Sequence, residues 1–206
     1  AVLLDVLAMA QNTFSACEII VVDDGSTDGT SELFEKYSSV RYIKHNNNKG
    51  IGEALRTGYS IASMEYVCAV PGDGQFDVKE LAIVSPFNFN QFYSFYRPIT
   101  NYSIYRKSLT CFNKVFNAVF IGLRIRDVNW IKVYRKDQLV FVNPQLTSSI
   151  VESEICAKLM KSGIRPVEIA SVYHTRKTGQ AKGGNWKTLR KAIGEMLELY
   201  SVTKSF

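Results

Sequence analysis

Two short acidic clusters, each at the end of an apolar run, hold side chains that could bind a phosphorylated ligand. The first is VVDDGSTDGT (21–30), whose adjacent carboxylates can accept hydrogen bonds from a nucleobase imide or a ribose. The second is VPGDGQFD (70–77), in which Asp73 and Gln75 offer the oxygen ligands that Mg²⁺ and Mn²⁺ prefer. Alone, each also fits a structural interpretation: an acidic helix N-terminus for the first, or a Pro-Gly turn with solvated carboxylates for the second.

A third cluster, HTRKTGQAKGG (174–184), is basic and rich in glycine. Arg176 and Lys182 flank a loop that could close over phosphates and offset the charge of a leaving group. Residues 174–191 contain six Lys or Arg and no Asp or Glu, which a solvated loop and helix face would explain as well. The net charge of +6 favours anionic partners without choosing among phosphates, nucleic acid and an acidic membrane surface.

The composition predicts one globular domain over residues 1–206, because the chain has 206 residues, of which 46% are hydrophobic and 21% charged. No apolar run approaches the ~20 residues that span a bilayer. The four cysteines form no CxxC pair and there are only two histidines, which argues against a disulfide framework or a zinc site. A reducing, cytoplasmic setting is therefore expected.

In the first half of the chain, strand and helix patterns alternate, which predicts an α/β fold with a parallel sheet and right-handed crossovers. The expected order is strand 17–25, helix 26–37, strand 40–45, helix 49–63 and a strand from 66 that Pro71 breaks. Ligands bind at the carboxyl ends of such strands, so loops 23–30 and 71–77 should share one cleft. A nucleotide-binding domain normally opens with a buried strand, whereas this sequence begins in a helix, so we expect the first strand to be missing.

The second half shows a different pattern. Segment 85–105 is aromatic and polar without a clear period, and 106–123 has apolar residues at helical spacing. A strand followed by a helical turn (128–141), a helix ending before Gly163, and a strand from 165 come next. The last helix should bury an apolar stripe made of Leu189, Ile193, Met196, Leu197 and Tyr200.

Taken together and in this order, the motifs resemble the family-2 glycosyltransferases, and most closely the polyprenol-phosphate (dolichol-phosphate) sugar synthases. The resemblance implies a GT-A, Rossmann-like fold with a mostly parallel central sheet flanked by helices. It also implies a nucleotide-binding half at about 1–84 and an acceptor-side half at about 85–206. One departure is clear: Pro71 stands where the family has the first acid of its D-x-D motif.

The resemblance also implies roles for individual residues. Those expected to contact the nucleotide or its phosphates are Val22, Asp24, Pro71, Gly72, Asp73, Gln75, Arg97, Arg176 and Lys182. Asp73 and Gln75, in GDGQFD, would hold Mg²⁺ or Mn²⁺. Arg97, in FYRP, would face the diphosphate. Asp127, in RDVNWIKVYRK, would lie on the acceptor side.

The implied reaction is an inverting transfer from a GDP- or UDP-hexose to a polyprenol or dolichol phosphate. An acceptor phosphate is already anionic, so catalysis would rest on positioning and on charge stabilisation by the metal, Arg97, Arg176 and Lys182. A hydroxyl acceptor would instead need a carboxylate base. Asp127 is then the first candidate, followed by Glu152 and Glu154 on a helix where at least one should be solvated.

The basic stretch 174–191 and the aromatic segment 86–105 could place the protein peripherally at the cytoplasmic face of a membrane. Two alternatives stay open. One is a soluble transferase that acts on a glycan or protein hydroxyl. The other is a catalytically weak nucleotide-sugar-binding pseudo-transferase, suggested by Pro71. No nucleic-acid partner is expected, because no binding motif accompanies the basic charge.

Overall fold

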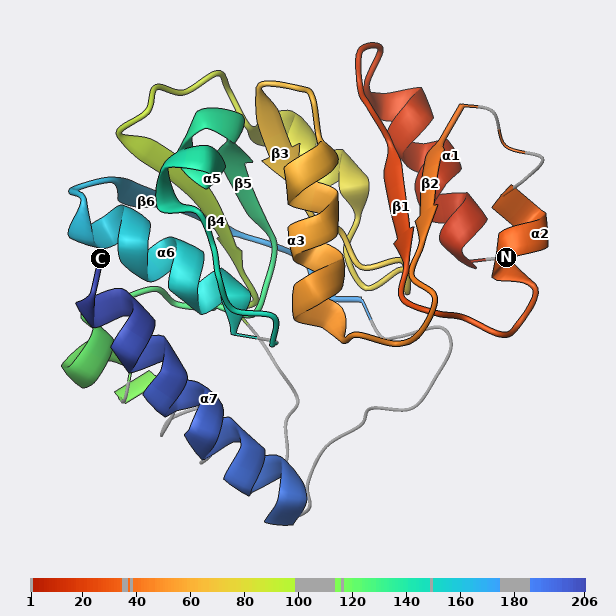
Figure 1. Ribbon diagram of the computed structural model, residues 1–206. Coiled ribbons are helices and arrows are strands. Elements are labelled where there is room, and N and C mark those ends of the chain that lie inside the picture. Colours follow the sequence, from red (N-terminus) through yellow and green to blue (C-terminus); the bar gives the residue numbers. More distant parts are fainter. Residues whose placement is uncertain are drawn as a thin grey trace.

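The computed structural model describes residues 2–34, 37, 39–98, 114–115, 117–148, 150–174 and 186–206 (Figure 1). The described elements follow in the order α1 (Val2–Thr13), β1 (Ile20–Asp23), α2 (Thr30–Phe34), β2 (Arg41–Lys44), α3 (Ile51–Ile61), β3 (Tyr66–Cys68), η1 (Val78–Ile83), β4 (Gln91–Tyr96), η2 (Asn117–Ile121), β5 (Lys132–Arg135), α5 (Lys136–Val142), α6 (Val151–Lys161), β6 (Arg165–Ala170) and α7 (Trp186–Lys204).

The strands form two sheets within the described residues. β1 and β2 pair in parallel, with Ile20 opposite Arg41, as the alternating pattern predicts. The other sheet has the order β3-β5-β4-β6, in which β4 and β6 are parallel and β5 is antiparallel to both of its neighbours. The α/β class is thus confirmed, but β3 pairs with β5 rather than continuing a parallel sheet from β1.

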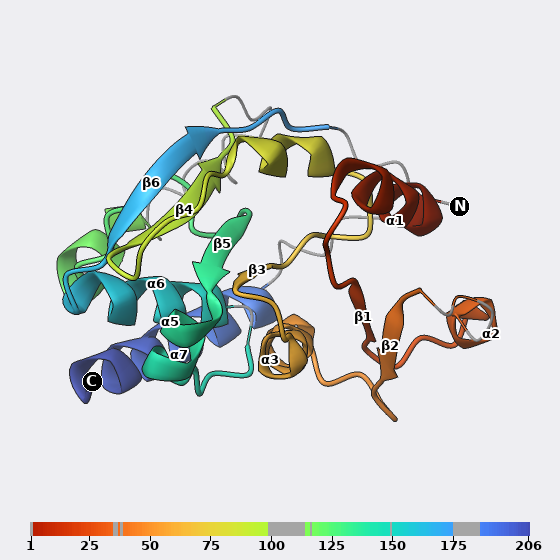
Figure 2. The ribbon, with the colours of Figure 1, turned by 90° about the horizontal axis from the view of Figure 1, so that it is seen from above.

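Helices and η1 cover both faces of the four-stranded sheet (Figure 2). Along β4, side chains alternate between the faces because successive residues of a strand point in opposite directions. Phe92 belongs to a core with Tyr134, Ile155 and Leu199, on the side of α5, α6 and α7. Phe95 belongs to a second core with Phe76, on the side of η1. Phe92 and Phe95 of the aromatic segment therefore lie on a central strand, β4, which the sequence pattern of that segment did not predict.

The two sheets are linked through α3. Helix α3 packs on β1, where a side chain added at Gly58 would touch the methyl group of Val22 at 3.5 Å. At its other side, a Cβ on Gly52 would come within 2.0 Å of the carbonyl oxygen of Ser148, so only glycine fits there. A small third core around Leu7, Phe34 and Val40 completes the part of the chain around β1 and β2.

The last helix forms as predicted, but its buried face differs from the predicted stripe. Leu197 and Tyr200 are exposed, whereas Leu199 and Thr203 are buried. Met196 is half-buried and the buried residues are four apart, so the helical period was correct, but the buried face does not include Leu197 and Tyr200. The side chains of Leu189 and Ile193 lie outside the described part of the structure.

Candidate active site

Loops from four strands meet at one edge of the four-stranded sheet. β3, β4 and β6 end there, and β5, which is antiparallel to β3 and β4, begins there. Four segments follow or precede these strand ends: the loop 71–77, Arg97, the turn 127–131 and the segment 171–174. Carboxyl ends of strands in an α/β sheet are the usual ligand-binding edge. The sequence motifs that were assigned to metal, diphosphate and acceptor thus meet at this edge.

Arg97 and Asp127 form a two-point ion pair at this edge. Nε of Arg97 lies 2.7 Å from Oδ2 of Asp127, and Nη2 lies 3.0 Å from Oδ1. The side chains are 14% and 16% exposed, respectively, so the ion pair is largely buried and a small part of it remains accessible to solvent. A planar guanidinium matches a carboxylate in this geometry, which makes the pair specific as well as strong. The residue predicted to face the diphosphate therefore holds the residue predicted to act as a base.

Two aromatic rings surround the guanidinium of Arg97. Its central carbon lies 4.4 Å from the ring centre of Trp130 and 5.6 Å from that of Tyr173. The two rings pack against each other at 5.8 Å, and the indole N–H of Trp130 donates to Ser171 Oγ at 3.1 Å. A cation over an aromatic face is attracted by the ring quadrupole. The charge of Arg97 is thus fixed in both position and orientation.

Tyr173 also connects this arginine to the predicted metal motif. The side-chain amide of Gln75 donates to the Tyr173 hydroxyl at 2.6 Å, and the backbone N–H of His174 donates to the carbonyl of Gln75 at 3.1 Å. Gln75 is therefore held by the segment that leads into the glycine-rich loop. Its amide oxygen remains the atom with which it could meet a cation.

The residues present fit a divalent cation only if the ligand supplies part of its coordination. Among the described residues, no group of three or more His, Cys, Asp or Glu side chains is placed to hold a metal. Asp73 accepts the backbone N–H of Gln75 at 3.1 Å through one oxygen, in a turn where Gly74 has a φ of 74°. Mg²⁺ is commonly held by one or two carboxylates together with substrate phosphates and water. Asp73 with the Gln75 amide suits that kind of site.

Asp24 has a structural role at a helix N-terminus, which is the kind of role that the sequence analysis kept as an alternative to nucleotide binding. Its carboxylate accepts the backbone N–H groups of Lys49 at 2.9 Å and Gly50 at 2.7 Å, and it contacts Nδ1 of His45 at 2.8 Å. Burial would raise the pKa of Asp24, but these hydrogen bonds together lower it below its ordinary value. The carboxylate thus ties the end of β1 to the start of α3. A contact between Asp24 and a nucleobase stays a prediction.

The remaining nucleotide contacts of the first half lie near the strand ends. The side chain of Val22 faces α3 at Gly58. Pro71 and Gly72 are exposed in the loop after β3, where a Cβ on Gly72 would meet the side chain of Leu3 at 2.8 Å. Their nucleotide contacts stay predictions, as does the shared cleft of loops 23–30 and 71–77. Arg176 and Lys182 lie outside the described residues.

The two further candidate bases do not lie on a solvated helix face, which corrects the expectation for α6. Glu152 accepts hydrogen bonds from the hydroxyls of Tyr59 and Tyr134, the second at 2.5 Å. Burial and the nearby carboxylate of Glu152 raise the pKa of Tyr59 well above its ordinary value, so the hydroxyl stays a donor. Glu154 is fully buried and pairs with Lys158 at 2.6 Å.

Three residues of this edge had no assigned role from the sequence: Trp130, Lys132 and Tyr173. Trp130 and Lys132 lie within the apolar strand pattern of VNWIKVYR, where a lone lysine among buried positions was the available signal. Tyr173 lies just before the basic cluster and carried no comparable signal. Its role depends on a contact with Gln75, which lies 98 residues away in the chain.

The fold with this edge is that of the GT-A glycosyltransferases, which solved structures share. Glucosyl-3-phosphoglycerate synthase from Mycobacterium tuberculosis, crystallised with UDP, superposes with a TM-score of 0.69 at 15% identity, covering 98% of this chain and 76% of that one. The same enzyme has also been crystallised with Mn²⁺, UDP-glucose and glycerol 3-phosphate, with a TM-score of 0.60, 16% identity, and coverage of 98% of this chain and 75% of that one. At this identity the likeness concerns the fold alone.

The sequence pattern of "Glycosyl transferase family 2" matches residues 1–110, more than half of the chain, and the chain therefore belongs to that family. A dolichyl-phosphate beta-glucosyltransferase from Dictyostelium discoideum is 35% identical over 69 residues, covering 31% of this chain and 21% of that protein. Glycosyltransferase AglJ from Haloferax volcanii is 25% identical over 198 residues, covering 91% of this chain and 63% of that protein. The matched segments thus span between a fifth and two thirds of these two relatives.

The described helices include none with the length and apolar character that crossing a bilayer requires.

Proposed function

We propose that this chain is the catalytic domain of a glycosyltransferase that moves a hexose, with inversion, from a nucleotide diphosphate to a lipid phosphate. The donor is a GDP- or UDP-hexose, and the acceptor is a polyprenol or dolichol phosphate. Family membership and the relative that acts on dolichyl phosphate support the reaction class. The Mn²⁺ and nucleotide sugar bound by a solved structure of the same fold support the donor and the metal.

One observation favours an anionic acceptor over a hydroxyl: each carboxylate considered as a base is already held by other groups. Asp127 is bound at both oxygens by Arg97, Glu152 by two tyrosine hydroxyls, and Glu154 by Lys158 and by backbone N–H groups. A hydroxyl acceptor needs a free base to take its proton. A phosphate oxygen carries its own negative charge and attacks without that help.

In this mechanism the protein binds and orients charge. A divalent cation held by Asp73 and the Gln75 amide, with the donor diphosphate, would stabilise the negative charge of the leaving group. Arg97 supplies a second fixed positive charge at the same edge, oriented by Asp127 and Trp130 before the reaction begins. Fixed charges that need no reorganisation are the most effective stabilisers of a transition state. Arg176 and Lys182 are proposed to add their charges from the glycine-rich loop.

The direct test is transfer from GDP- and UDP-hexoses with Mn²⁺, comparing polyprenol phosphate with hydroxyl acceptors such as free sugars and glycerol 3-phosphate. We expect a glycosyl phosphate lipid as product, with the anomeric configuration inverted when read by NMR. Transfer to hydroxyl acceptors alone would overturn the lipid-phosphate assignment. Donor binding without any transfer would indicate a pseudo-transferase instead.

Metal dependence is tested at Asp73. Asp73→Asn keeps the size of the side chain but removes its charge, so we expect at least about a 100-fold loss of kcat with little change in the thermal unfolding midpoint. Excess EDTA should have the same effect on the wild type. Full activity of the wild type in EDTA would exclude the metal from the mechanism.

The proposal places the protein peripherally at the cytoplasmic face of a membrane. Apolar side chains are exposed on two neighbouring elements: Val119 and Phe120 on η2, and Leu197 on α7. The positive net charge suits an anionic surface. Flotation with anionic vesicles should carry the wild type to the top of the gradient and leave Leu197→Asp behind. Equal flotation of both proteins would exclude this surface.

A further inference from the structure

The buried side chain of Lys132, at the start of β5, takes no direct part in the proposed mechanism. It is 2% exposed. Moving an ammonium group out of water is costly unless its hydrogen bonds are replaced. A lysine retained at such a position must therefore be satisfied by groups around it.

All three hydrogen bonds that a lysine can donate go to one turn. Nζ of Lys132 donates to the carbonyl oxygens of Asp127 at 2.8 Å, Val128 at 3.2 Å and Trp130 at 3.0 Å. Three carbonyl dipoles that point at one spot repel one another unless a cation lies between them. The ammonium of Lys132 therefore fixes the shape of the turn 127–131 from its buried side.

This turn carries two of the groups that hold Arg97. Asp127 binds its guanidinium at two points, and Trp130 lies against its face at 4.4 Å. An arginine that stabilises a leaving group must keep its position to within a fraction of an ångström to be effective. We infer that Lys132 is a positioning residue, which orients Arg97 for the transfer reaction by holding the turn that carries Asp127 and Trp130. The inference rests on the proposed function only for its effect on catalysis.

The chain offers a matched control at the other end of the same strand. Lys136, the residue after β5, donates from Nζ to the carbonyl oxygens of Tyr59 at 2.7 Å and Ser60 at 3.1 Å. It thus closes the end of α3 in the way that Lys132 closes the turn. Its acceptors are far from Arg97 in the chain and hold none of the groups around it.

The kinetic experiment compares Lys132→Met with Lys136→Met. Methionine has a similar length but no charge and no donor. Lys132→Met should lower kcat at least about tenfold while donor KM changes less than about threefold, because the lost interaction acts in the transition state. Lys136→Met should lower the thermal unfolding midpoint with both constants unchanged. Equal kcat in the wild type and in folded Lys132→Met would overturn the inference.

A second measurement does not depend on activity. The chain has two tryptophans, so Trp186→Phe leaves Trp130 as the only tryptophan, which can be excited at wavelengths that tyrosine does not absorb. In that background Lys132→Met should increase acrylamide quenching of Trp130 at least about twofold, because the turn loosens, and Lys136→Met should not. Unchanged quenching in Lys132→Met would overturn the inference even if the wild type transfers no sugar. Inactivity of the wild type with increased quenching would instead refute the proposed function and leave the positioning role standing.

Should Lys132→Met not fold, Lys132→Gln keeps two N–H donors on a shorter chain and is read in the same two assays. Circular dichroism and thermal unfolding establish that each variant is folded before its kinetics are compared. A folded Lys132→Gln with the kcat and the quenching of the wild type would also contradict the inference.

Discussion

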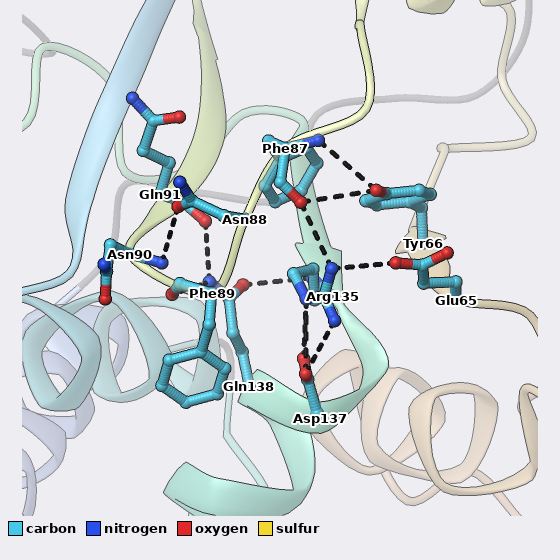
Figure 3. Close-up of polar contacts among 10 residues, drawn as sticks. All are labelled: Glu65, Tyr66, Phe87, Asn88, Phe89, Asn90, Gln91, Arg135, Asp137 and Gln138. Carbon is cyan, nitrogen blue, oxygen red and sulfur yellow. Dashed lines mark hydrogen bonds and ion pairs between the residues drawn. The ribbon is translucent and has the colours of Figure 1, made fainter.

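The two ends of the four-stranded sheet carry the same kinds of side chains in different arrangements. At one end, Arg97 pairs with Asp127 beside Tyr173. At the other end, where β5 finishes, Arg135 pairs with Asp137 beside Tyr66 (Figure 3). Each end thus combines an arginine, an aspartate and a tyrosine. The comparison between them separates a site from a structural network.

At the Arg135 end, the interactions join elements that are already adjacent. The guanidinium of Arg135 binds Asp137, two residues later, at 2.9 Å, and Glu65, next to its strand neighbour Tyr66, at 2.7 Å. It also donates to the carbonyl of Phe87 at 3.2 Å, which the hydroxyl of Tyr66 contacts as well (Figure 3). The hydrogen bond to Asp137 and the nearby carboxylates raise the pKa of Arg135. This network closes the strand ends and the start of α5.

At the Arg97 end, the partners come from loops that meet only in the folded chain. Asp127 lies 30 residues from Arg97, and Tyr173 receives its hydrogen bond from Gln75. These residues lie at the end of the sheet where β3, β4 and β6 finish, which is the usual ligand-binding end of an α/β sheet. Identical residue types thus join neighbouring elements at one end and, in the proposed function, bind the diphosphate at the other.

The largest difference should appear between the two arginines. Arg97→Lys should lower kcat by about 100-fold, because an ammonium cannot reproduce the two-point geometry that the guanidinium has with an anion. Arg135→Lys should lower the thermal unfolding midpoint and leave kcat and KM unchanged. Steady-state kinetics and thermal unfolding of both variants test whether the first substitution affects catalysis and the second affects stability. Equal kinetic effects of the two substitutions would end the distinction between the two ends.

Substitutions of the two aspartates should differ less in their effect on kcat than those of the two arginines. Asp127→Asn loosens Arg97, so we expect kcat to fall about tenfold with a lipid-phosphate acceptor and the pH profile to keep its shape. If Asp127 is the general base instead, kcat should fall by about 1000-fold and the rise of activity with pH should disappear. Asp137→Asn should affect neither. The pH dependence of kcat/KM for the three proteins decides between these roles.

The two tyrosines offer a still smaller effect. Tyr173→Phe keeps the ring beside Trp130 but removes the hydroxyl that holds Gln75, so we expect kcat to fall by about three- to tenfold, with more Mn²⁺ needed for half activity. Tyr66→Phe removes only the hydrogen bonds between the hydroxyl and the backbone of Phe87 and should leave the kinetics unchanged. Titration of activity with Mn²⁺ is the measurement. An unchanged Mn²⁺ requirement in Tyr173→Phe would separate Tyr173 from the metal motif.

The smallest effect concerns the acid stability of the Arg135 end. Hydrogen bonding to Arg135 outweighs burial and lowers the pKa of Asp137. A lowered folded-state pKa stabilises the fold above the ordinary value of about 3.9, and that stability is lost as the pH falls through the lowered pKa. The unfolding midpoint of the wild type should therefore exceed that of Asp137→Asn near neutral pH, and the difference should vanish in acid. Because Asp137 is 49% exposed, the difference should be small and should shrink further in high salt.

The sequence by itself determined the class of the fold and named most residues of the proposed site. Strands and helices follow from local patterns, since β-branched runs and helical periods depend on neighbours in the chain. Motifs such as GDGQFD and FYRP therefore led to Asp73, Gln75 and Arg97, and the family assignment to the glycosyl transferases was confirmed. The antiparallel course of β5 had no local signal, because the direction of a strand is set by what it pairs with.

Only the tertiary structure decided how these residues act on one another. It joined Arg97 to Asp127 and placed Trp130 and Tyr173 against the guanidinium. It also buried Lys132 against the turn 127–131. It also gave Asp24 three hydrogen-bonding partners and set the buried face of α7 at Leu199. The physical reason is the same in each case: a hydrogen bond, an ion pair or a buried surface depends on which atoms are brought together. That depends on the packing of distant segments rather than on residue type and spacing.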